Sequence, residues 1–216
     1  MSDQATTLLL SRHGQTDWHR DNRYAGADSD IDLTATGQAQ ARALAGFART
    51  RRPHVVISSP VRRAMETAEP AAAALQLSLK VVEDLREVGF GLAEGRTATE
   101  LDDLDPGIMR RFRLDPVAHP FPGAEPPETA ARRAAEALRE IAERHRGSTV
   151  LVVAHNTLLR LALCTLLDLP LNRYRQIFPR LDNAAITELR LPAKPTDPAS
   201  LMSLNVPVTA PALPGP

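Results

Sequence analysis

The sequence has one cysteine and no net charge in 216 residues. One cysteine excludes a disulfide framework within the chain, and Cys164 lies inside an apolar run, so we expect a packed thiol rather than a nucleophile. Lysine plus arginine and aspartate plus glutamate both number 26. Because no net basic field exists, binding of nucleic acid or of an anionic membrane surface is not expected, and any recognition of an anion must be local.

Long apolar runs are absent as well. No uninterrupted apolar run approaches the roughly 18 residues that a membrane-spanning helix requires. The first residues have neither the charged nor the apolar region of a secretory signal. We therefore expect a soluble cytoplasmic protein without a membrane partner. A chain of this length can bury a substantial core, and a single domain with a modest insertion is its simplest organisation.

The sequence also lacks several familiar binding motifs. It has no Walker A motif, and the glycines between Gly89 and Gly95 have one residue too many for the dinucleotide fingerprint. Neither an HExxH motif nor the paired Cys-His spacing of a zinc site appears. A nucleotide cofactor is therefore a weak alternative, and we expect no cofactor and no metal ion.

Short aliphatic segments that end in polar side chains are what the sequence offers instead. Residues 8–10 lead into Arg12 and His13, and residues 150–154 lead into His155 in the same way. Continuous apolar segments of this length are typical of strands that are covered on both faces. Open α/β sheets bind ligands at the carboxyl ends of such strands. We therefore expect the two histidines to meet at one edge of the sheet.

Helical patterns alternate with these strands, which predicts an α/β fold with three layers, α/β/α, and a mostly parallel central sheet. Apolar periodicity and capping residues predict helices at about 34–52, 61–75, 128–146 and 158–167. Pro60 is expected at the start of the second helix. Residues 55–57 and 79–82 predict further strands, and residues 184–191 alternate like an edge strand.

Two segments depart from this alternation. Residues 91–127 are interrupted by six prolines, which predicts a lid-like insertion over the site. From Pro192 onward the chain is proline-rich and has neither helical nor strand periodicity, which predicts an extended or disordered tail over 192–216. We therefore expect one domain over residues 1–191, followed by this tail.

Cations and one carboxyl group stand where they could join the histidines. Arg62 and Arg63 lie in the first turn of a predicted helix, where the helix dipole already favours an anion. Adjacent helical residues point about 100° apart, so only one of the two is expected to face the sheet edge. Glu87 has apolar neighbours. Together these groups suit a dianion such as a phosphate monoester, because guanidinium groups match phosphoryl oxygens and the helix N-termini after Ser59 and His155 add N–H donors.

The sequence resembles the histidine phosphatase superfamily, which has the phosphoglycerate mutase-like fold. Its motifs occur along the chain in the same order as in that family. They are the R-H-G-x-T signature at 12–16 and the segments 31–39, 58–68, 85–95 and 152–155. The resemblance covers roughly residues 7–190, and within the family the sequence resembles the phosphatase branch.

The resemblance implies a catalytic role for each matching residue. His13 would be the nucleophile that becomes phosphohistidine, while Arg12 and His155 would hold the phosphoryl oxygens. The family arginine precedes an alanine, which selects Arg63 as a further phosphate ligand. Glu87 would be the proton donor, and its apolar neighbours would favour a raised pKa.

Further residues near these motifs are predicted to contact the substrate. The family usually has asparagine after the tryptophan, but His19 stands there, and its imidazole could either donate a similar hydrogen bond or point away. The other predicted substrate contacts are Gln15, Thr16, Arg62, Asn156 and Thr157.

The resemblance implies a metal-independent phosphomonoesterase that hydrolyses small phosphorylated metabolites through a phosphohistidine intermediate. A phosphoglycerate mutase is the first alternative, although true mutases are longer and have histidine and tyrosine where this chain has Val88-Gly89-Phe90. A module that binds a phosphorylated ligand without catalysis is the second. Family members are often dimers, so the resemblance leaves a homodimer open.

Overall fold

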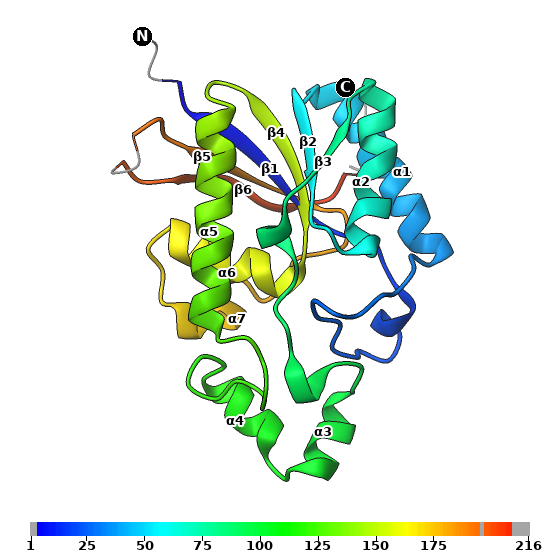
Figure 1. The fold of residues 1–216 in the computed structure, drawn as a ribbon, viewed down its shortest axis with the longest axis vertical. Helices are drawn as coiled ribbons and strands as arrows, with labels where there is room; N and C mark the ends of the chain where they lie inside the picture. The colour runs from blue at the N-terminus through cyan, green and yellow to red at the C-terminus, as the bar shows by residue number, and fades with distance from the viewer. Residues whose placement is uncertain (1–3, 195–196, 209–216) are drawn as a thin grey trace, which may run out of the picture.

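A six-stranded sheet forms the centre of the computed structural model, which describes residues 4–194 and 197–208 (Figure 1). The strand order is β3-β2-β4-β1-β5-β6. The first four strands run parallel, whereas β5 is antiparallel to β1 and β6 is antiparallel to β5. The sequence predicted this mostly parallel sheet. The strands are β1 (Thr6–Arg12), β2 (Val55–Ser58), β3 (Leu79–Val81), β4 (Thr149–Ala154), β5 (Ile186–Leu191) and β6 (Ser200–Val206).

Helices cover both faces of the sheet, which confirms the three-layer α/β/α architecture. On one side α1 (Ala35–Arg51) packs beside α2 (Arg62–Leu75), and on the other α5 (Pro127–Arg144) packs beside α6 (Asn156–Leu166) (Figure 1). The short α7 (Tyr174–Ile177) follows α6. Short 3-10 turns lie at Asp17–His19, Glu83–Leu85, Gly91–Ala93 and Leu171–Arg173. In the described part of the chain, no helix combines the length and the apolar character needed to cross a membrane.

The two faces of the central strands belong to two separate apolar clusters. Leu8 and Leu10 of β1 pack with residues of α5 and α6, whereas Leu9 packs with residues of α1 and α2. Successive strand residues point to opposite faces, so β1 needs a continuous aliphatic run because neither face meets water. Burying one such leucine contributes about 1.5–3 kcal/mol. Cys164 is buried in the first of these clusters, as predicted for a packed thiol.

Three elements differ from the sequence-based predictions. Val61 is the N-cap residue of α2, so Pro60 precedes the helix and does not open it. Strand β5 lies between β1 and β6 and is therefore not an edge strand. The prediction of an extended or disordered tail over 192–216 is wrong for β6, which pairs with β5, while residues 209–216 lie outside the described residues. Strand β6 is largely exposed on both faces, so burial imposes no alternation on its sequence.

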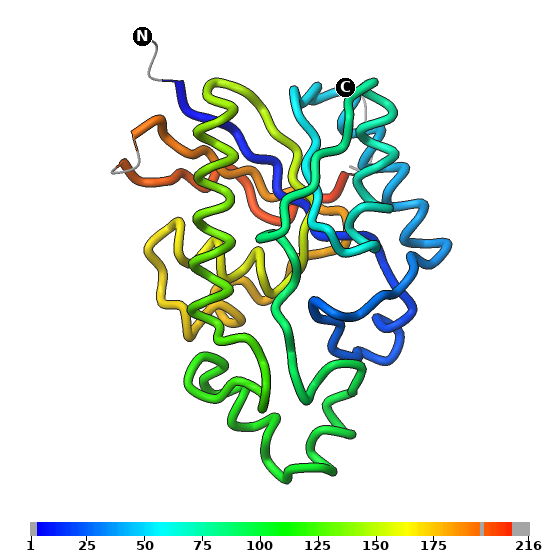
Figure 2. The backbone as a smooth tube through the Cα atoms, in the orientation of Figure 1, coloured from blue at the N-terminus to red at the C-terminus, as the bar shows by residue number. Residues whose placement is uncertain are grey.

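The insertion at 91–127 forms a small helical lobe at the carboxyl ends of the strands. It contains α3 (Ala98–Leu104) and α4 (Ile108–Leu114), and Figure 2 shows it below the sheet, beside the loop that follows β1. The Tyr24 ring of that loop packs against Phe112 and Phe121 of the lobe, with centroid distances of 6.1 and 5.1 Å, and against Phe90, which directly precedes the lobe, at 5.3 Å. These ring contacts join the lobe to the loop after β1.

A close approach of two backbones fixes the loop after β1 against the start of α1. A Cβ atom on Gly14 would lie 2.7 Å from the carbonyl oxygen of Gly37, and one on Gly37 would lie 2.1 Å from the carbonyl oxygen of Gln15. Of the two candidate caps, Thr34 and Thr36, Thr34 caps α1 by accepting a hydrogen bond from the Gly37 N–H at 3.0 Å. This contact sets the position of the polar residues that follow β1.

Replacing Gly37 with alanine is expected to lower the free energy of unfolding by about 1–3 kcal/mol, because the new Cβ must displace backbone. Gly46→Ala is the matched control in the same helix. A Cβ there meets nothing within 4 Å, so this change should raise the free energy of unfolding by about 0.5–1 kcal/mol. Urea-induced unfolding measures both, and a stabilising effect of Gly37→Ala would contradict the packing role of this glycine.

Candidate active site

The carboxyl ends of β1 and β4 bring the two strand-terminal histidines together. Arg12 of β1 is the register partner of Ala154 in the neighbouring parallel strand β4. His13 and His155 therefore leave the sheet side by side, and their ring centroids are 5.3 Å apart. The prediction that both histidines meet at one edge of the sheet is confirmed.

The His13 ring is held in one tautomer. Its Nδ1 lies 2.7 Å from the carbonyl oxygen of Gly14. Because a carbonyl only accepts hydrogen bonds, Nδ1 carries the proton and Nε2 holds the lone pair. Burial, followed by the charges of Arg63 and His155, lowers the pKa of His13 well below its ordinary value. The imidazole is therefore neutral at pH 7.

Arg63 lies in the first turn of α2 and is completely buried. Its Nε donates to Nε2 of His13 at 3.3 Å. Its terminal nitrogens donate to three backbone carbonyl oxygens, those of Ala25, Gly26 and Ser29. The loop after β1 thereby fixes the guanidinium against His13, so Arg63 is the arginine of its pair that faces the sheet edge.

Two predicted substrate contacts lie elsewhere and are corrected here. Arg62 is exposed and pairs with Glu66 at 3.0 Å and with Asp30 at 3.6 Å. The side chain of Gln15 accepts a hydrogen bond from the Thr34 hydroxyl at 2.9 Å. Neither Arg62 nor Gln15 lines the pocket described below. Their charged and polar groups are used within the fold, so we do not assign them to the substrate.

Arg12 and His19 hold one another at the pocket wall. Nη1 of Arg12 donates to the carbonyl oxygen of Leu181 at 3.0 Å, and Nη2 lies 2.5 Å from Nε2 of His19. Arginine can only donate, so Nε2 of His19 accepts from it. Nδ1 of His19 faces Thr16, whose hydroxyl lies 2.8 Å away and whose backbone N–H lies 3.0 Å away. Burial and the charge of Arg12 lower the pKa of His19 to about 4. His19 therefore orients Arg12 and has no N–H on Nε2 to offer a ligand.

The segment after β4 places two polar atoms without a protein partner near His13. Nε2 of His155 lies 2.7 Å from the Ser59 hydroxyl. The Ser59 hydroxyl accepts a hydrogen bond from the Val61 N–H and donates its own proton to Nε2 of His155. The imidazole proton of His155 is therefore on Nδ1. Nδ1 of His155 and Oδ1 of Asn156 are buried and have no hydrogen-bond partner among the described residues. A bound oxyanion would satisfy the Nδ1 donor.

Glu87 is buried at the start of α6. Its carboxyl oxygens accept hydrogen bonds from the N–H groups of Val88, Thr157 and Leu158 at 2.9, 3.1 and 2.9 Å. Burial raises the pKa of Glu87 and outweighs these hydrogen bonds, which favour the charged form. The expectation that the helix N-terminus after His155 offers its N–H groups to phosphate is corrected, because two of them bind this carboxyl group.

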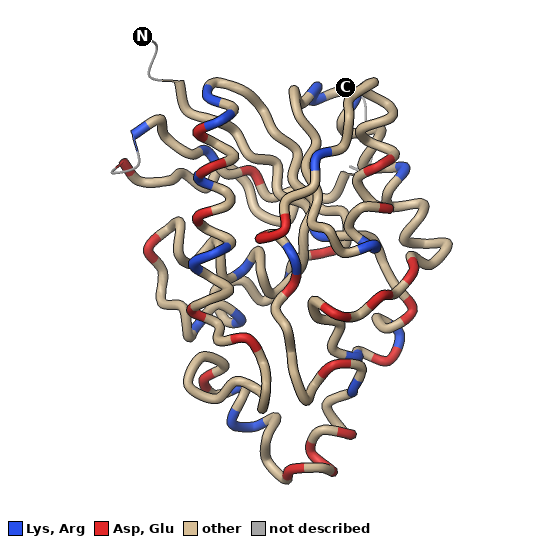
Figure 3. Tube along the Cα trace, viewed as in Figure 1, with Lys and Arg blue, Asp and Glu red and all other residues tan. Residues whose placement is uncertain are grey.

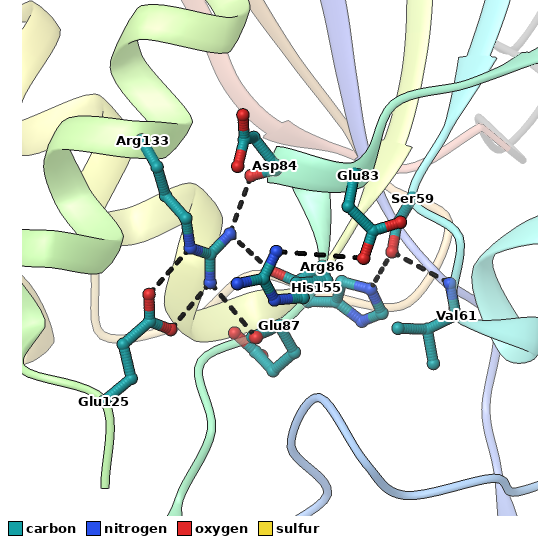
Figure 4. A network of polar contacts seen from close by, with 9 residues as sticks. All are labelled: Ser59, Val61, Glu83, Asp84, Arg86, Glu87, Glu125, Arg133 and His155. Atoms are coloured by element: carbon teal, nitrogen blue, oxygen red, sulfur yellow. Dashed lines mark hydrogen bonds and ion pairs between the residues drawn. The ribbon is translucent and has the colours of Figure 1, made fainter.

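Arg133 of α5 holds the backbone that carries Glu87 (Figure 4). Its guanidinium donates to both carboxylate oxygens of Glu125 at 2.7 and 2.8 Å. It also donates to the carbonyl oxygens of Asp84, Arg86 and Glu87 at 2.7, 2.9 and 3.2 Å. Burial opposes the charge of Glu125, but the hydrogen bonds and charge of Arg133 prevail and lower its pKa. Arg133 is therefore a positioning residue for Glu87.

A pocket of about 310 Å³ opens at this edge of the sheet. Basic and acidic residues are interspersed along the chain as a whole (Figure 3), so the concentration of cations at the pocket is local. In residues 4–194 and 197–208, no group of three or more His, Cys, Asp or Glu side chains is placed to hold a metal ion. The predicted site residues that line the pocket are Arg12, His13, Thr16, His19, Glu87, Asn156 and Thr157.

Comparison with known families agrees with this geometry. The model of the histidine phosphatase superfamily (branch 1) matches residues 8–200. The chain belongs to the histidine phosphatase superfamily. Within this family, the chain is similar to the bifunctional protein Rv2228c of Mycobacterium tuberculosis, with 42% identity over 163 residues. That match covers 73% of this chain and 44% of the relative, so the chain spans less than half the length of that protein.

Two further relatives match over most of their length. The putative phosphoserine phosphatase 2 of Hydrogenobacter thermophilus is 33% identical over 85% of this chain and 89% of that protein. The solved structure of the mycobacterial glucosyl-3-phosphoglycerate phosphatase Rv2419c superposes with a TM-score of 0.83 at 28% identity. It covers 94% of this chain and 100% of that one.

Sequence reasoning missed three residues that shape this histidine phosphatase site. Ser59 holds His155, the Thr67 hydroxyl accepts from the Gly14 N–H at 2.9 Å, and Asn183 donates to the His13 carbonyl oxygen at 2.7 Å. Ser59 and Thr67 lie inside a quoted motif and could have been found there. Asn183 lies in the turn before β5, where no sequence pattern marks it.

Replacing Arg133 with alanine is expected to lower the free energy of unfolding by about 2–3 kcal/mol at pH 7, because Glu125 and three carbonyl groups lose their partner. Because the pKa of Glu125 is lowered in the folded protein, its pairing with Arg133 stabilises the fold fully at pH values above the ordinary pKa of glutamate. This stabilisation is lost as the pH falls through the pKa of Glu125 in the folded protein. The cost of the substitution should therefore shrink in acid. Denaturant unfolding at several pH values measures it.

The matched control for Arg133 is its exposed neighbour, Arg132→Ala, which should change stability by less than about 0.5 kcal/mol. An equal loss in both variants, or a cost for Arg133→Ala that does not vary between pH 7 and pH 3, would contradict the role of the Glu125 pair.

Proposed function

We propose that the chain is a metal-independent phosphomonoesterase that hydrolyses small phosphorylated metabolites through a phosphohistidine intermediate on His13. The observation that carries the proposal is the neutral His13 ring, whose Nε2 lone pair lies among Arg12, Arg63 and His155. A neutral imidazole in a cationic pocket is a nucleophile placed where a phosphate dianion would bind. Two of the relatives are themselves named as phosphatases of small phosphorylated metabolites.

In the first step, Nε2 of His13 attacks phosphorus in line with the ester oxygen. The P–N bond forms as the P–O bond to the alcohol breaks, and Glu87 gives its proton to the leaving oxygen. The raised pKa of Glu87 suits this step, because the carboxyl group must hold a proton in the resting enzyme. The bond from Nδ1 to the Gly14 carbonyl keeps Nε2 deprotonated and aligned.

In the second step, water attacks the phosphohistidine. Glu87, now a carboxylate, accepts a proton from the water as the P–N bond breaks, and the electron pair returns to Nε2 of His13. Inorganic phosphate leaves and both residues regain their starting states. Glu87 thus acts as acid and then as base within one cycle.

Fixed donors balance the charge on the phosphoryl oxygens in both steps. The guanidinium group of Arg63 is buried and Arg12 is half-buried, and Nε of Arg12 has no partner within the described residues. The unpartnered Nδ1–H of His155 adds a third donor. Such preorganised donors need no reorganisation when charge develops in the transition state, so the proposed mechanism routes no step through a metal ion.

A phosphatase accounts for the surroundings of the acid better than a mutase does. Val88 and Phe90 belong to the segment where true mutases have histidine and tyrosine, and both are buried, at 3% and 6% exposure. A mutase must also keep its phosphohistidine until a second acceptor binds, whereas hydrolysis needs only water. We further propose that the enzyme works in the cytoplasm on a small phosphorylated substrate, and family membership makes a homodimer the assembly to test first.

His13→Ala is expected to abolish hydrolysis of an aryl phosphate, because no other group in the pocket is placed to form the covalent intermediate. A catalytic nucleophile contributes several powers of ten in rate, at least about 10³-fold. His119→Ala, at an exposed histidine of the insertion, is the control. Turnover in EDTA and phosphoprotein labelling quenched under alkaline conditions test the reaction, and chelator-sensitive turnover would overturn the metal-free mechanism.

Glu87→Gln is expected to lower kcat for alkyl phosphates by about 10²–10⁴-fold, and to lower it much less for an aryl phosphate whose leaving group needs no proton. Because burial raises the pKa of Glu87, the acid is present below that pKa and lost as pH rises through it. The decrease in the rate of the first step at alkaline pH, which comes from ionisation of Glu87, should therefore be absent in the variant. Glu83→Gln, at an exposed carboxylate nearby, is the control, and equal losses on both substrates would contradict the acid role.

A further inference from the structure

The wall of the pocket has more positive charge than one phosphate requires. Four arginines line it, Arg12, Arg23, Arg113 and Arg175, against the single carboxyl group of Glu87. Glu87 has a raised pKa and is neutral when it holds its proton. The buried Arg63 adds a further cation behind His13.

Two of these arginines are already accounted for. Arg12 belongs to the phosphoryl site beside His19. Arg23 is neutralised, since its Nη1 lies 2.9 Å from Glu100 and donates to the carbonyl oxygen of Gly95 at 2.7 Å. Arg113 and Arg175 remain, and over residues 4–194 and 197–208 neither forms an ion pair with a carboxylate.

Arg113 and Arg175 converge from separate elements. Arg113 lies in α4 of the insertion and Arg175 in α7, and the charge of each favours ionisation of the same phenol, that of Tyr24. The guanidinium of Arg175 lies 5.4 Å from the ring centroid of Phe112, the residue before Arg113. Burial nevertheless raises the pKa of Tyr24, so its hydroxyl keeps a proton to donate.

From this arrangement we propose that Arg113, Arg175 and the Tyr24 hydroxyl form a second anion subsite, which binds an acidic group on the alcohol portion of the phosphomonoester substrate. The inference rests on the proposed phosphatase function. Arg12 and Arg63 match the charge of one phosphate dianion, so the two unpaired guanidinium groups match a second acidic group on the same molecule. Guanidinium binds carboxylate and phosphate oxygens alike in a bidentate manner.

The size of the pocket supports one ligand with two acidic ends. A volume of about 310 Å³ is that of a small metabolite. Like charges that converge without a counterion repel one another, and an anion between them removes that cost. Substrates with a neutral alcohol portion leave the charges of Arg113 and Arg175 without a counterion, so they should bind more weakly.

A matched substrate pair tests the subsite. 3-Phosphoglycerate and glycerol 3-phosphate share a carbon skeleton and a primary phosphate, and differ in a carboxylate against a neutral hydroxymethyl group. We expect kcat/KM to favour 3-phosphoglycerate by about tenfold or more, mainly through KM, since a charge-assisted hydrogen bond contributes enough for a tenfold change. Glycerol 1,3-bisphosphate forms the third arm, and a greater preference for it would identify the second acidic group as phosphoryl.

Variants assign the preference to residues. Arg113→Gln and Arg175→Gln should each lower the ratio of kcat/KM for 3-phosphoglycerate to that for glycerol 3-phosphate by about tenfold. Arg173→Gln, at an exposed arginine outside the pocket, should leave this ratio unchanged. Equal effects of the pocket variants on both substrates would overturn the subsite, because they would indicate a general disturbance of the lobe.

The outcome separates the two proposals. An enzyme that hydrolyses an aryl phosphate but does not prefer either acidic substrate retains the phosphatase function and refutes the subsite. If no phosphomonoester is hydrolysed, the phosphatase proposal fails. Calorimetric binding of 3-phosphoglycerate and glycerol 3-phosphate to the same variants then decides the subsite alone, with equal affinities refuting it.

Discussion

Parallel pairing of β1 with β4 is the constraint on which the rest of the structure depends. The pairing continues one residue past β1, where the His13 N–H donates to the Ala154 carbonyl oxygen at 3.0 Å. Both strands are buried on both faces, and the four long helices supply that cover. A slip of one residue would turn every side chain to the opposite face, so the apolar clusters that stabilise the sheet also fix the height at which His13 and His155 emerge.

The site keeps its positive charge because its cations are anchored mainly by neutral acceptors. Arg63 donates to backbone carbonyls of the loop after β1, and Arg12 donates to Leu181 and His19. Carbonyl and imidazole acceptors satisfy N–H groups without cancelling the charge. Arg133 shows the contrast, since its pairing with Glu125 cancels its charge and leaves it a structural role. The choice of partner therefore separates arginines that serve a ligand from those that serve the fold.

The sequence predicts the elements that have a repeated or continuous apolar pattern. It does not predict contacts that depend on how distant segments of the chain fold together. The sheet is located by the aliphatic runs of β1 and β4, and α1 is located by its apolar periodicity. The family motifs locate His13, Arg63 and Glu87. Strand β6 was not predicted, because burial imposes no alternating pattern on the sequence of an exposed edge strand. The acceptor role of His19 could not be predicted, since it follows from the position of Arg12. Nor could the contact of Asn183, which lies 170 residues from His13 along the chain.

The hydrogen bonds of Glu87 have a consequence for the reaction cycle as a whole. In the proposed mechanism its carboxyl group becomes an anion halfway through each turnover. That anion forms in contact with three N–H groups, two of them in the first turn of α6, where the helix dipole stabilises negative charge. The N–H groups that stabilise the ionised carboxylate are therefore already in place before Glu87 gives up its proton. Burial sets the acid for the first step, and the helix terminus holds the base for the second, so one side chain serves two opposite roles without moving.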